Sequence, residues 1–318
     1  MFITGATGFI GKNLVKLLVA QDKYLVKCLV RKSSNVQELK VFRNVELIYQ
    51  DLTRSTMKEL VQILKNTEQV IHLAGVIYSK RILDYYKVNY EATTILAEAA
   101  KLAGVKKFVF VSSISAVGPR ASDIVCNEDS PCYPIDAYGK SKLLAERYLI
   151  NMWQKERFPV IIIRPAFVYG KGGKKGIQIY QKLLNFGVFP MVGRKGLKRS
   201  LCHVEDVAEG IILALERGKE GEVYILSEGV YTTDQIVKTL AQLTSKKVVF
   251  IRLSKSVVET ILWIGNLLGK ILPSFSEYQK MIYGFFKYNW AFDSTKARRE
   301  LNFVPKISLI EGLKKMIN

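Results

Sequence analysis

The sequence predicts an α/β fold: a doubly wound parallel sheet with helices on both faces, joined to a smaller, mostly C-terminal α/β domain. Three observations predict this fold. Apolar or β-branched residues 2–4 run directly into a turn with glycines at 5, 8 and 11, and a helical pattern follows. Strand-like and helical patterns then alternate over two hundred residues, and the strands are almost continuously apolar, as in sheets buried on both faces. The 318 residues suffice for one large or two unequal domains.

The individual elements follow from local patterns of apolar residues. Beyond the first strand, further strands are expected at residues 24–30, 45–49, 69–73, 107–112 and 160–163. Helices are expected near residues 55–65, 82–103 and 137–157. A helix at 203–216 and a strand at 223–227 should return to the large domain. That domain would then comprise residues 1–164 and 200–227, and residues 165–199 and 228–318 would form a discontinuous substrate domain.

The glycine turn predicts a phosphate-binding site. Glycines at every third position let backbone N–H groups and a helix N-terminus approach a diphosphate where a Cβ atom would collide. Such a turn alone is a weak signal, and its position between a strand and a helix strengthens it. The residues expected to contact a dinucleotide here are Gly5, Thr7, Gly8, Phe9, Ile10 and Gly11.

Arg31 and Lys32 follow the second strand, where an NAD site usually has a carboxylate for the ribose 2′-hydroxyl. Two cations would attract a 2′-phosphate, so the sequence favours NADP over NAD as the cofactor.

The ends of the next strands supply further candidates. Asp51 and Leu52 are expected near the adenine, with Asp51 accepting its amino group. Leu73, Ala74 and Gly75 are expected where the cofactor presses close, and Asn89 is expected to bond to the cofactor or to backbone. His72 closes a buried strand and is interpreted as a structural residue.

Ser113, Tyr138 and Lys142 form the candidate catalytic group. Tyr138 and Lys142 are four residues apart and therefore share one face of a helix. An ammonium near a phenol should lower the phenol's pKa from about 10. Such a tyrosine can exchange a proton with a carbinol while a hydride moves to or from a nicotinamide. Ser113, at the end of a strand, would hold the substrate oxygen.

Composition limits the other functional classes. The formal net charge is +20, but the basic residues are scattered, so a nucleic-acid partner is not expected. Four cysteines without a C-x-x-C pair and only two histidines predict no metal site and a cytoplasmic location. The apolar side chains in residues 257–286 should pack in the small domain, and a peripheral membrane contact is the alternative.

These motifs together resemble the short-chain dehydrogenase/reductase superfamily, in its extended branch with the Rossmann fold. The matching segments are residues 4–11, Asp51-Leu52, residues 72–75, Val111-Ser112-Ser113, residues 138–142, Arg164-Pro165, Val168-Tyr169-Gly170, residues 203–208 and the tail at 290–301. The resemblance implies that Ser113, Tyr138 and Lys142 are catalytic, that Lys142 also contacts the nicotinamide ribose, and that Pro165 and Val168 border the nicotinamide. It also implies a homodimer.

The resemblance leaves the small-molecule substrate open. Phe167 stands where many sugar-nucleotide epimerases of this family have an asparagine, whereas Arg199 resembles the arginine that grips a diphosphate in those enzymes. The main hypothesis is an NAD(P)-dependent oxidoreductase acting on a carbinol or ketone, similar to 3β-hydroxysteroid dehydrogenases and dihydroflavonol reductases. The alternatives are a nucleotide-sugar 4-epimerase with tightly held NAD, and a non-catalytic NADP-binding sensor.

Overall fold

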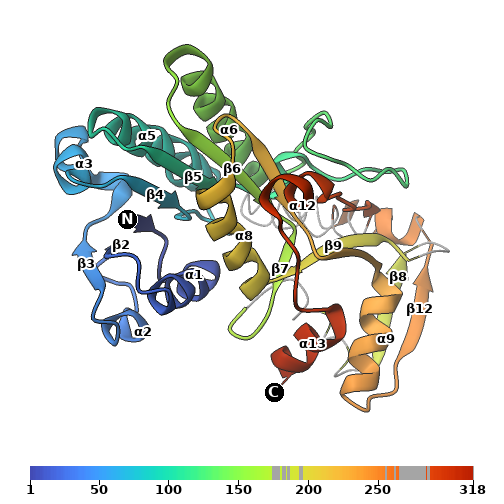
Figure 1. Ribbon diagram of the computed structural model, residues 1–318. Coiled ribbons are helices and arrows are strands. Elements are labelled where there is room, and N and C mark those ends of the chain that lie inside the picture. Colours follow the sequence, from blue (N-terminus) through green and yellow to red (C-terminus); the bar gives the residue numbers. More distant parts are fainter. Residues whose placement is uncertain are drawn as a thin grey trace.

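Seven parallel strands form the central sheet, in the order β10-β6-β5-β4-β1-β2-β3 (Figure 1). The computed structural model describes residues 1–173, 180, 184, 187–192, 196–254, 256–260, 263–264, 284 and 287–317. The strands of the sheet are β1 (Phe2–Thr4), β2 (Val26–Val30), β3 (Val45–Tyr49), β4 (Gln69–His72), β5 (Lys107–Val111), β6 (Val160–Pro165) and β10 (Val223–Leu226). From β1 the chain adds β2 and β3 on one side of the sheet and then β4, β5 and β6 on the other. In sheets of this kind ligands bind beyond the carboxyl ends of the strands at such a switch point.

Helices cover both faces of this sheet (Figure 1). On one face α1 packs against α8, and on the other α3 and α6 pack against α5. The helices are α1 (Phe9–Ala20), α2 (Gln37–Lys40), α3 (Met57–Leu64), α4 (Ile82–Tyr86), α5 (Ala92–Leu102), α6 (Ala137–Glu156), α8 (Val204–Arg217), α9 (Thr233–Leu243), α12 (Thr295–Leu301) and α13 (Leu309–Ile317). Single turns are η1 (Leu52–Arg54), η2 (Lys87–Glu91) and η3 (Ile114–Ala116). The doubly wound fold predicted from the sequence is therefore confirmed.

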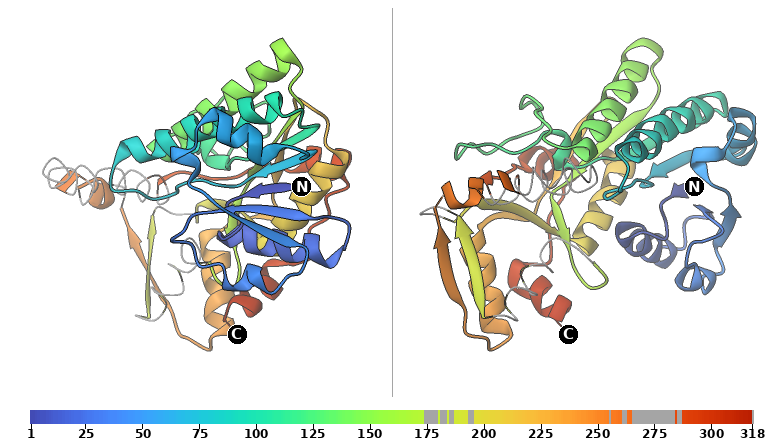
Figure 2. Two further views of the ribbon diagram at one scale, coloured as in Figure 1. Left: turned by 90° about the vertical axis from the view of Figure 1, so that its left-hand side faces the viewer. Right: turned by 180° about the vertical axis from the view of Figure 1, so that it is seen from behind.

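Two smaller sheets lie beside the central one (Figures 1 and 2). One contains β11 (Gly229–Thr232), β9 (Lys198–His203) and β7 (Phe167–Tyr169), and the other pairs β12 (Val249–Leu253) with β8 (Val188–Val192). Their core is separate from the two cores of the large sheet and includes Tyr169, Phe189 and Ile236.

Three apolar side chains of the tail at 257–286 do not pack inside as expected. Val257, Trp263 and Ile264 are 45%, 63% and 50% exposed. Val258 is half-buried and Gly284 is buried, and the tail residues at 261–262, 265–283 and 285–286 lie outside the described residues. Within the described part of the chain, no helix has both the length and the apolar character needed to span a membrane.

Candidate active site

The glycine turn between β1 and α1 requires glycine for steric reasons. Gly5 has a φ of +74°, and a Cβ atom there would lie 2.6 Å from the backbone nitrogen of Ala74. A Cβ atom on Gly11 would lie 2.2 Å from the carbonyl oxygen of Gly5. The turn is closed by a hydrogen bond of 2.9 Å from the Gly8 N–H to the Gly5 carbonyl. The first turn of α1 is therefore pressed against the end of β1.

This turn fits the diphosphate of a dinucleotide. Gly8 is the N-cap of the 12-residue helix α1, and among the described residues no side chain caps its first N–H groups. Orphan N–H groups and the positive end of the helix dipole both favour an anion at this position. The predicted contacts from residues 7 to 11 stay predictions, but the geometry is compatible with them.

The segment after β4 connects this turn to the candidate catalytic residues. The Ala74 N–H donates to the hydroxyl of Thr4 over 3.1 Å, so the segment lies against β1. One residue later, a Cβ atom on Gly75 would lie 3.4 Å from the Lys142 nitrogen. Residues 73–75 therefore place the glycine turn and Lys142 at one edge of the sheet.

Asn89, which lies in the turn η2, fixes the position of this segment by hydrogen bonds. Its Oδ1 accepts a hydrogen bond from the Val76 N–H at 2.7 Å, and its Nδ2 donates to the Val76 carbonyl and to the Ser141 hydroxyl, each at 3.0 Å. Both amide donors are used within the protein. Of the two roles left open by the sequence, the structure supports the bond to backbone.

His72 has a structural environment, as the sequence indicated. Its ring is fully buried, and its two nitrogens bond to the hydroxyls of Thr4 (2.6 Å) and Thr93 (2.8 Å). Burial, and then the nearby charge of Lys142, lower the pKa of His72 to about 3, so the ring is neutral at physiological pH.

Ser113, Tyr138 and Lys142 lie together at the carboxyl end of β5. Ser113 follows β5, and its hydroxyl lies close enough to the phenol of Tyr138, at the start of α6, to affect the pKa of that phenol. Lys142 lies one turn further along α6 and is 3% exposed. Its ammonium donates to the Val111 carbonyl at 2.9 Å and lies 4.6 Å from the centre of the Phe110 ring.

The pKa of Tyr138 departs from the sequence-based prediction. Burial raises this pKa above its ordinary value, and the nearby Ser113 hydroxyl only partly offsets the rise. The prediction that Lys142 lowers the phenol's pKa is therefore wrong for this arrangement, because the ammonium is directed to the Val111 carbonyl. Burial lowers the pKa of Lys142 itself to about 8.

The residues expected around the adenosine lie at the ends of β2 and β3. Arg31 and Lys32 are exposed directly after β2. Asp51 caps η1 by accepting hydrogen bonds from the N–H and hydroxyl of Thr53. Burial alone would raise the pKa of Asp51, but these bonds and the charges of Arg31 and Arg54 outweigh it and lower the pKa. Leu52 packs into the core, with 7% of its surface exposed.

The other two residues predicted to contact the substrate lie on β7 and β9, where one is an aromatic side chain and the other a buried arginine. Pro165 ends β6, and Phe167 and Val168 begin β7. The ring of Phe167 packs edge-on against Trp290, with 5.4 Å between centroids. Arg199 is 1% exposed and donates hydrogen bonds to the carbonyls of Lys198 and Tyr288. The substrate roles of Phe167 and Arg199 stay predictions.

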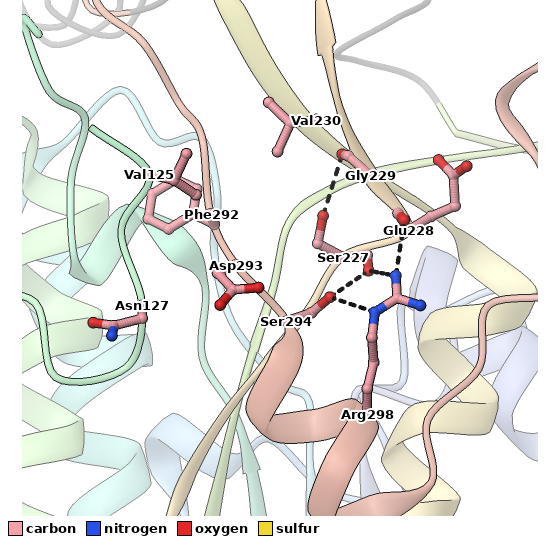
Figure 3. Close-up of a pocket in the computed structure, with 10 residues that line it drawn as sticks. All are labelled: Val125, Asn127, Ser227, Glu228, Gly229, Val230, Phe292, Asp293, Ser294 and Arg298. Carbon is pink, nitrogen blue, oxygen red and sulfur yellow. Dashed lines mark hydrogen bonds between the residues drawn. The ribbon is translucent and has the colours of Figure 1, made fainter. Parts of the chain in front are cut away.

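A pocket of about 320 Å³ lies elsewhere, between residues 227–230 and 292–294 (Figure 3). The guanidinium of Arg298 borders it and bonds to the carbonyls of Ser227 and Glu228 and to the hydroxyl of Ser294. None of Ser113, Tyr138 and Lys142 lines this pocket. The candidate active site is therefore formed by the side chains at the strand ends.

One buried ion pair beside the site was not predicted from the sequence. Glu146 lies one turn after Lys142 on α6 and is paired with Arg164 of β6. The available signal was the spacing of four residues between Lys142 and Glu146, together with an arginine inside an apolar strand.

Comparisons with known proteins agree with this geometry. Residues 1–227 match the NAD dependent epimerase/dehydratase family. The chain is 30% identical over 328 residues to UDP-glucose 4-epimerase of Vibrio cholerae, covering 99% of this chain and 93% of the relative. It is 29% identical over 253 residues to ceramide reductase of Caulobacter vibrioides, covering 79% and 72%. The solved structure of MoeE5 with UDP-glucuronic acid and NAD superposes with a TM-score of 0.76 at 25% identity, covering 99% and 97%.

Proposed function

Because the chain belongs to the NAD dependent epimerase/dehydratase family, we propose that Ser113, Tyr138 and Lys142 catalyse hydride transfer between a nicotinamide cofactor and a carbinol or ketone carbon. The observation that carries this proposal is that the Ser113 hydroxyl lies close enough to the Tyr138 phenol to lower its pKa, one helical turn from the buried Lys142. Residues 73–75 connect this group to the glycine turn.

Each of the three side chains has a distinct task. The Ser113 hydroxyl orients the substrate oxygen toward the phenol of Tyr138, which gives or takes the proton. The ammonium of Lys142, which is bonded to the Val111 carbonyl in this arrangement, would turn toward the phenolate that forms when the phenol gives up its proton and stabilise it. The cofactor, when bound, supplies or accepts the hydride. The glycine turn would hold its diphosphate, and Pro165 and Val168 would border its nicotinamide.

NADP is the proposed cofactor, with NAD as the alternative. The support is the pair of exposed cations Arg31 and Lys32 after β2. Replacing Arg31 by aspartate should repel a 2′-phosphate, because a charge-assisted hydrogen bond contributes about 1.5–3 kcal/mol. We expect Arg31→Asp to weaken NADPH binding about tenfold or more and to leave NADH binding almost unchanged, as measured by fluorescence titration.

Arg43→Asp is the matched control for that experiment, because Arg43 is also exposed and the change in charge is the same. It should leave both dissociation constants unchanged. If Arg31→Asp still prefers NADPH as strongly as the natural chain does, the assignment of Arg31 is wrong.

The proposed reaction is a net oxidation or reduction, and 4-epimerisation of a nucleotide sugar is the second candidate. The packing of Phe167 on Trp290 favours the first, because this position offers no amide for a diphosphate. The similarity to UDP-glucose 4-epimerase favours the second. Incubation with UDP-sugars, sterols and aromatic ketones distinguishes them: a reductase oxidises bulk NADPH and lowers the absorbance at 340 nm, whereas an epimerase recycles its cofactor.

Assembly, domain boundaries and location are further proposals. We infer a homodimer that forms through the two long helical segments, at residues 82–102 and 137–156. Light scattering should detect it as twice the chain mass of 36.1 kDa. The domain division at residues 164/165, 199/200 and 227/228 and the cytoplasmic location stay predictions.

The exposed Val257, Trp263 and Ile264 support a peripheral membrane contact, and sedimentation with anionic vesicles at low salt tests it.

A further inference from the structure

A buried ion pair follows the catalytic residues along α6. Arg164 donates two hydrogen bonds to Glu146, from Nε to Oε1 at 3.0 Å and from Nη2 to Oε2 at 2.7 Å. The side chains of Arg164 and Glu146 are only 6% and 4% exposed. Apolar side chains of similar volume often replace such a pair without loss of stability. Stability alone therefore does not account for charges at this position.

The position of Glu146 relates it directly to Lys142. The two residues are four apart on α6, so they lie on the same face of this helix. Burial lowers the pKa of Lys142 to about 8, and the carboxylate of Glu146 acts against this effect. Glu146 is therefore the group that favours the charged form of Lys142.

The other elements packed around Lys142 supply no second carboxylate among the described residues. From β4 it faces His72, which is neutral because burial lowers its pKa to about 3. From β5 it contacts the Val111 carbonyl and the Phe110 ring. From α6 itself come Tyr138 and Glu146, and near Gly75 lies the neutral amide of Asn89.

Arg164 holds the Glu146 carboxylate in a fixed orientation. Both carboxylate oxygens accept hydrogen bonds from the guanidinium, and its remaining donors extend to the Glu128 carbonyl at 3.3 Å and to Cys132 Sγ at 3.8 Å. The pair therefore connects β6, α6 and the loop that leads into Tyr138. A shift of either residue would disturb the carboxylate beside Lys142.

We propose that Glu146 is a positioning residue that keeps the catalytic Lys142 in its charged form, and that Arg164 holds Glu146 in place for this task. The proposal rests on the proposed function, because it takes Lys142 as catalytic. A neutral Lys142 could not stabilise a phenolate at Tyr138, so loss of Glu146 should reduce turnover at the alkaline end of the pH range.

The experiment measures the ionisation of Lys142 in the full-length protein by NMR with 13Cε-labelled lysine. Lys142→Met identifies the resonance. The test variant is Glu146→Leu with Arg164→Met, which removes both charges and leaves no buried ion without its partner. We expect the midpoint of the Lys142 titration to fall by about one pH unit or more, as when an opposite charge is removed from close range.

A surface pair on the same helix provides the matched control. Glu156 of α6 bonds to Lys101 of α5, and both side chains are 38% exposed. Glu156→Leu with Lys101→Met should leave the titration of Lys142 unchanged. If the buried double variant does not fold, as judged by circular dichroism, Glu146→Gln provides the same test, because it removes the charge and keeps an oxygen for Arg164.

The outcomes separate this inference from the proposed function. An unchanged Lys142 midpoint in a folded Glu146 variant overturns the inference, even if Lys142→Met abolishes turnover. Full turnover in Lys142→Met overturns the proposed function, whatever the titration shows. Both proposals are supported if the midpoint falls and the alkaline limb of the pH–rate profile falls with it, and if Glu146→Asp restores both toward their original values.

Discussion

Gly5 and Gly104 share one backbone conformation but have different surroundings. Both have a φ of +74°, but a Cβ atom on Gly5 would press on Ala74, whereas one on Gly104 would meet no described atom within 4 Å. Gly5→Ala and Gly104→Ala should each lower the free energy of unfolding by about 1–2 kcal/mol, because an alanine is strained in this left-handed conformation. Gly5→Ala should lose about 1–3 kcal/mol more in urea unfolding, because it also overpacks the turn. If both variants lose the same free energy of unfolding, the glycine turn accommodates a Cβ atom at Gly5 without additional strain.

His72 should make stability depend on pH. Its pKa is about 3 in the folded protein and about 6.5 when unfolded. Between these values the unfolded chain binds the extra proton, so this part of the stability is present above about pH 6.5 and is lost as the pH falls. Between these two pKa values, the contribution of His72 to the free energy of unfolding changes by up to about 1.4 kcal/mol per pH unit.

We therefore expect the melting temperature to fall less steeply from pH 7 to pH 5 in His72→Gln than in the natural chain. Titrating carboxylates and His203 affect both proteins alike, so the difference in slope isolates His72. Parallel curves would mean that His72 is accessible to protons in the folded state.

The sequence predicted which residues reach the site better than it predicted their interactions. His72 and Lys142 could be placed because each follows from a local pattern. The partner of the Lys142 ammonium could not, because the Val111 carbonyl lies 31 positions away in the chain. For the same reason the predicted direction of the Tyr138 pKa was wrong: burial depends on the whole fold, whereas the spacing of Tyr138 and Lys142 is local.

At the scale of elements, Asn89 determines how the segment after β4 lies against α6. Asn89→Leu would leave the Val76 N–H and carbonyl without their partner, and each such loss costs about 1–3 kcal/mol. We expect a destabilisation of about 2–5 kcal/mol in urea unfolding, together with weaker cofactor binding.

Asn44→Leu is the control for this prediction, since the amide of Asn44 makes one long bond of 3.5 Å, to the Tyr24 carbonyl. It should cost far less than Asn89→Leu. If both variants have the same stability and the same affinity for NADPH, the hydrogen bonds of Asn89 have no role in shaping the site.

The strands of the central sheet could be predicted because each is a continuous apolar run with a turn at its end. The predicted strand at 45–49 has the observed bounds, and the one at 69–73 is one residue too long. The pairing of β8 with β12 could not be predicted, because it joins Val188 to Val249 across 60 intervening residues. The π turn η2, which interrupts the helix expected at 82–103, contains neither proline nor glycine as a local signal.

At the scale of the whole molecule, the two halves of the proposed site differ in how they are built. The cofactor half follows from the topology, because the ends of β1, β4 and β5 are neighbours in one sheet and aligned in register. The substrate half combines β7, β9 and residue 290, which are far apart in the sequence. This difference explains why the reaction class could be predicted from the sequence while the substrate could not.

The replacement of Tyr138 by phenylalanine tests the central claim most directly. Tyr133→Phe is the control, because Tyr133 is 65% exposed in the loop before α6. With a substrate identified from the panel, we expect Tyr138→Phe to lower turnover, followed at 340 nm, by about 10²–10⁴-fold, with NADPH binding retained and the control fully active. Turnover that persists in Tyr138→Phe would contradict the account.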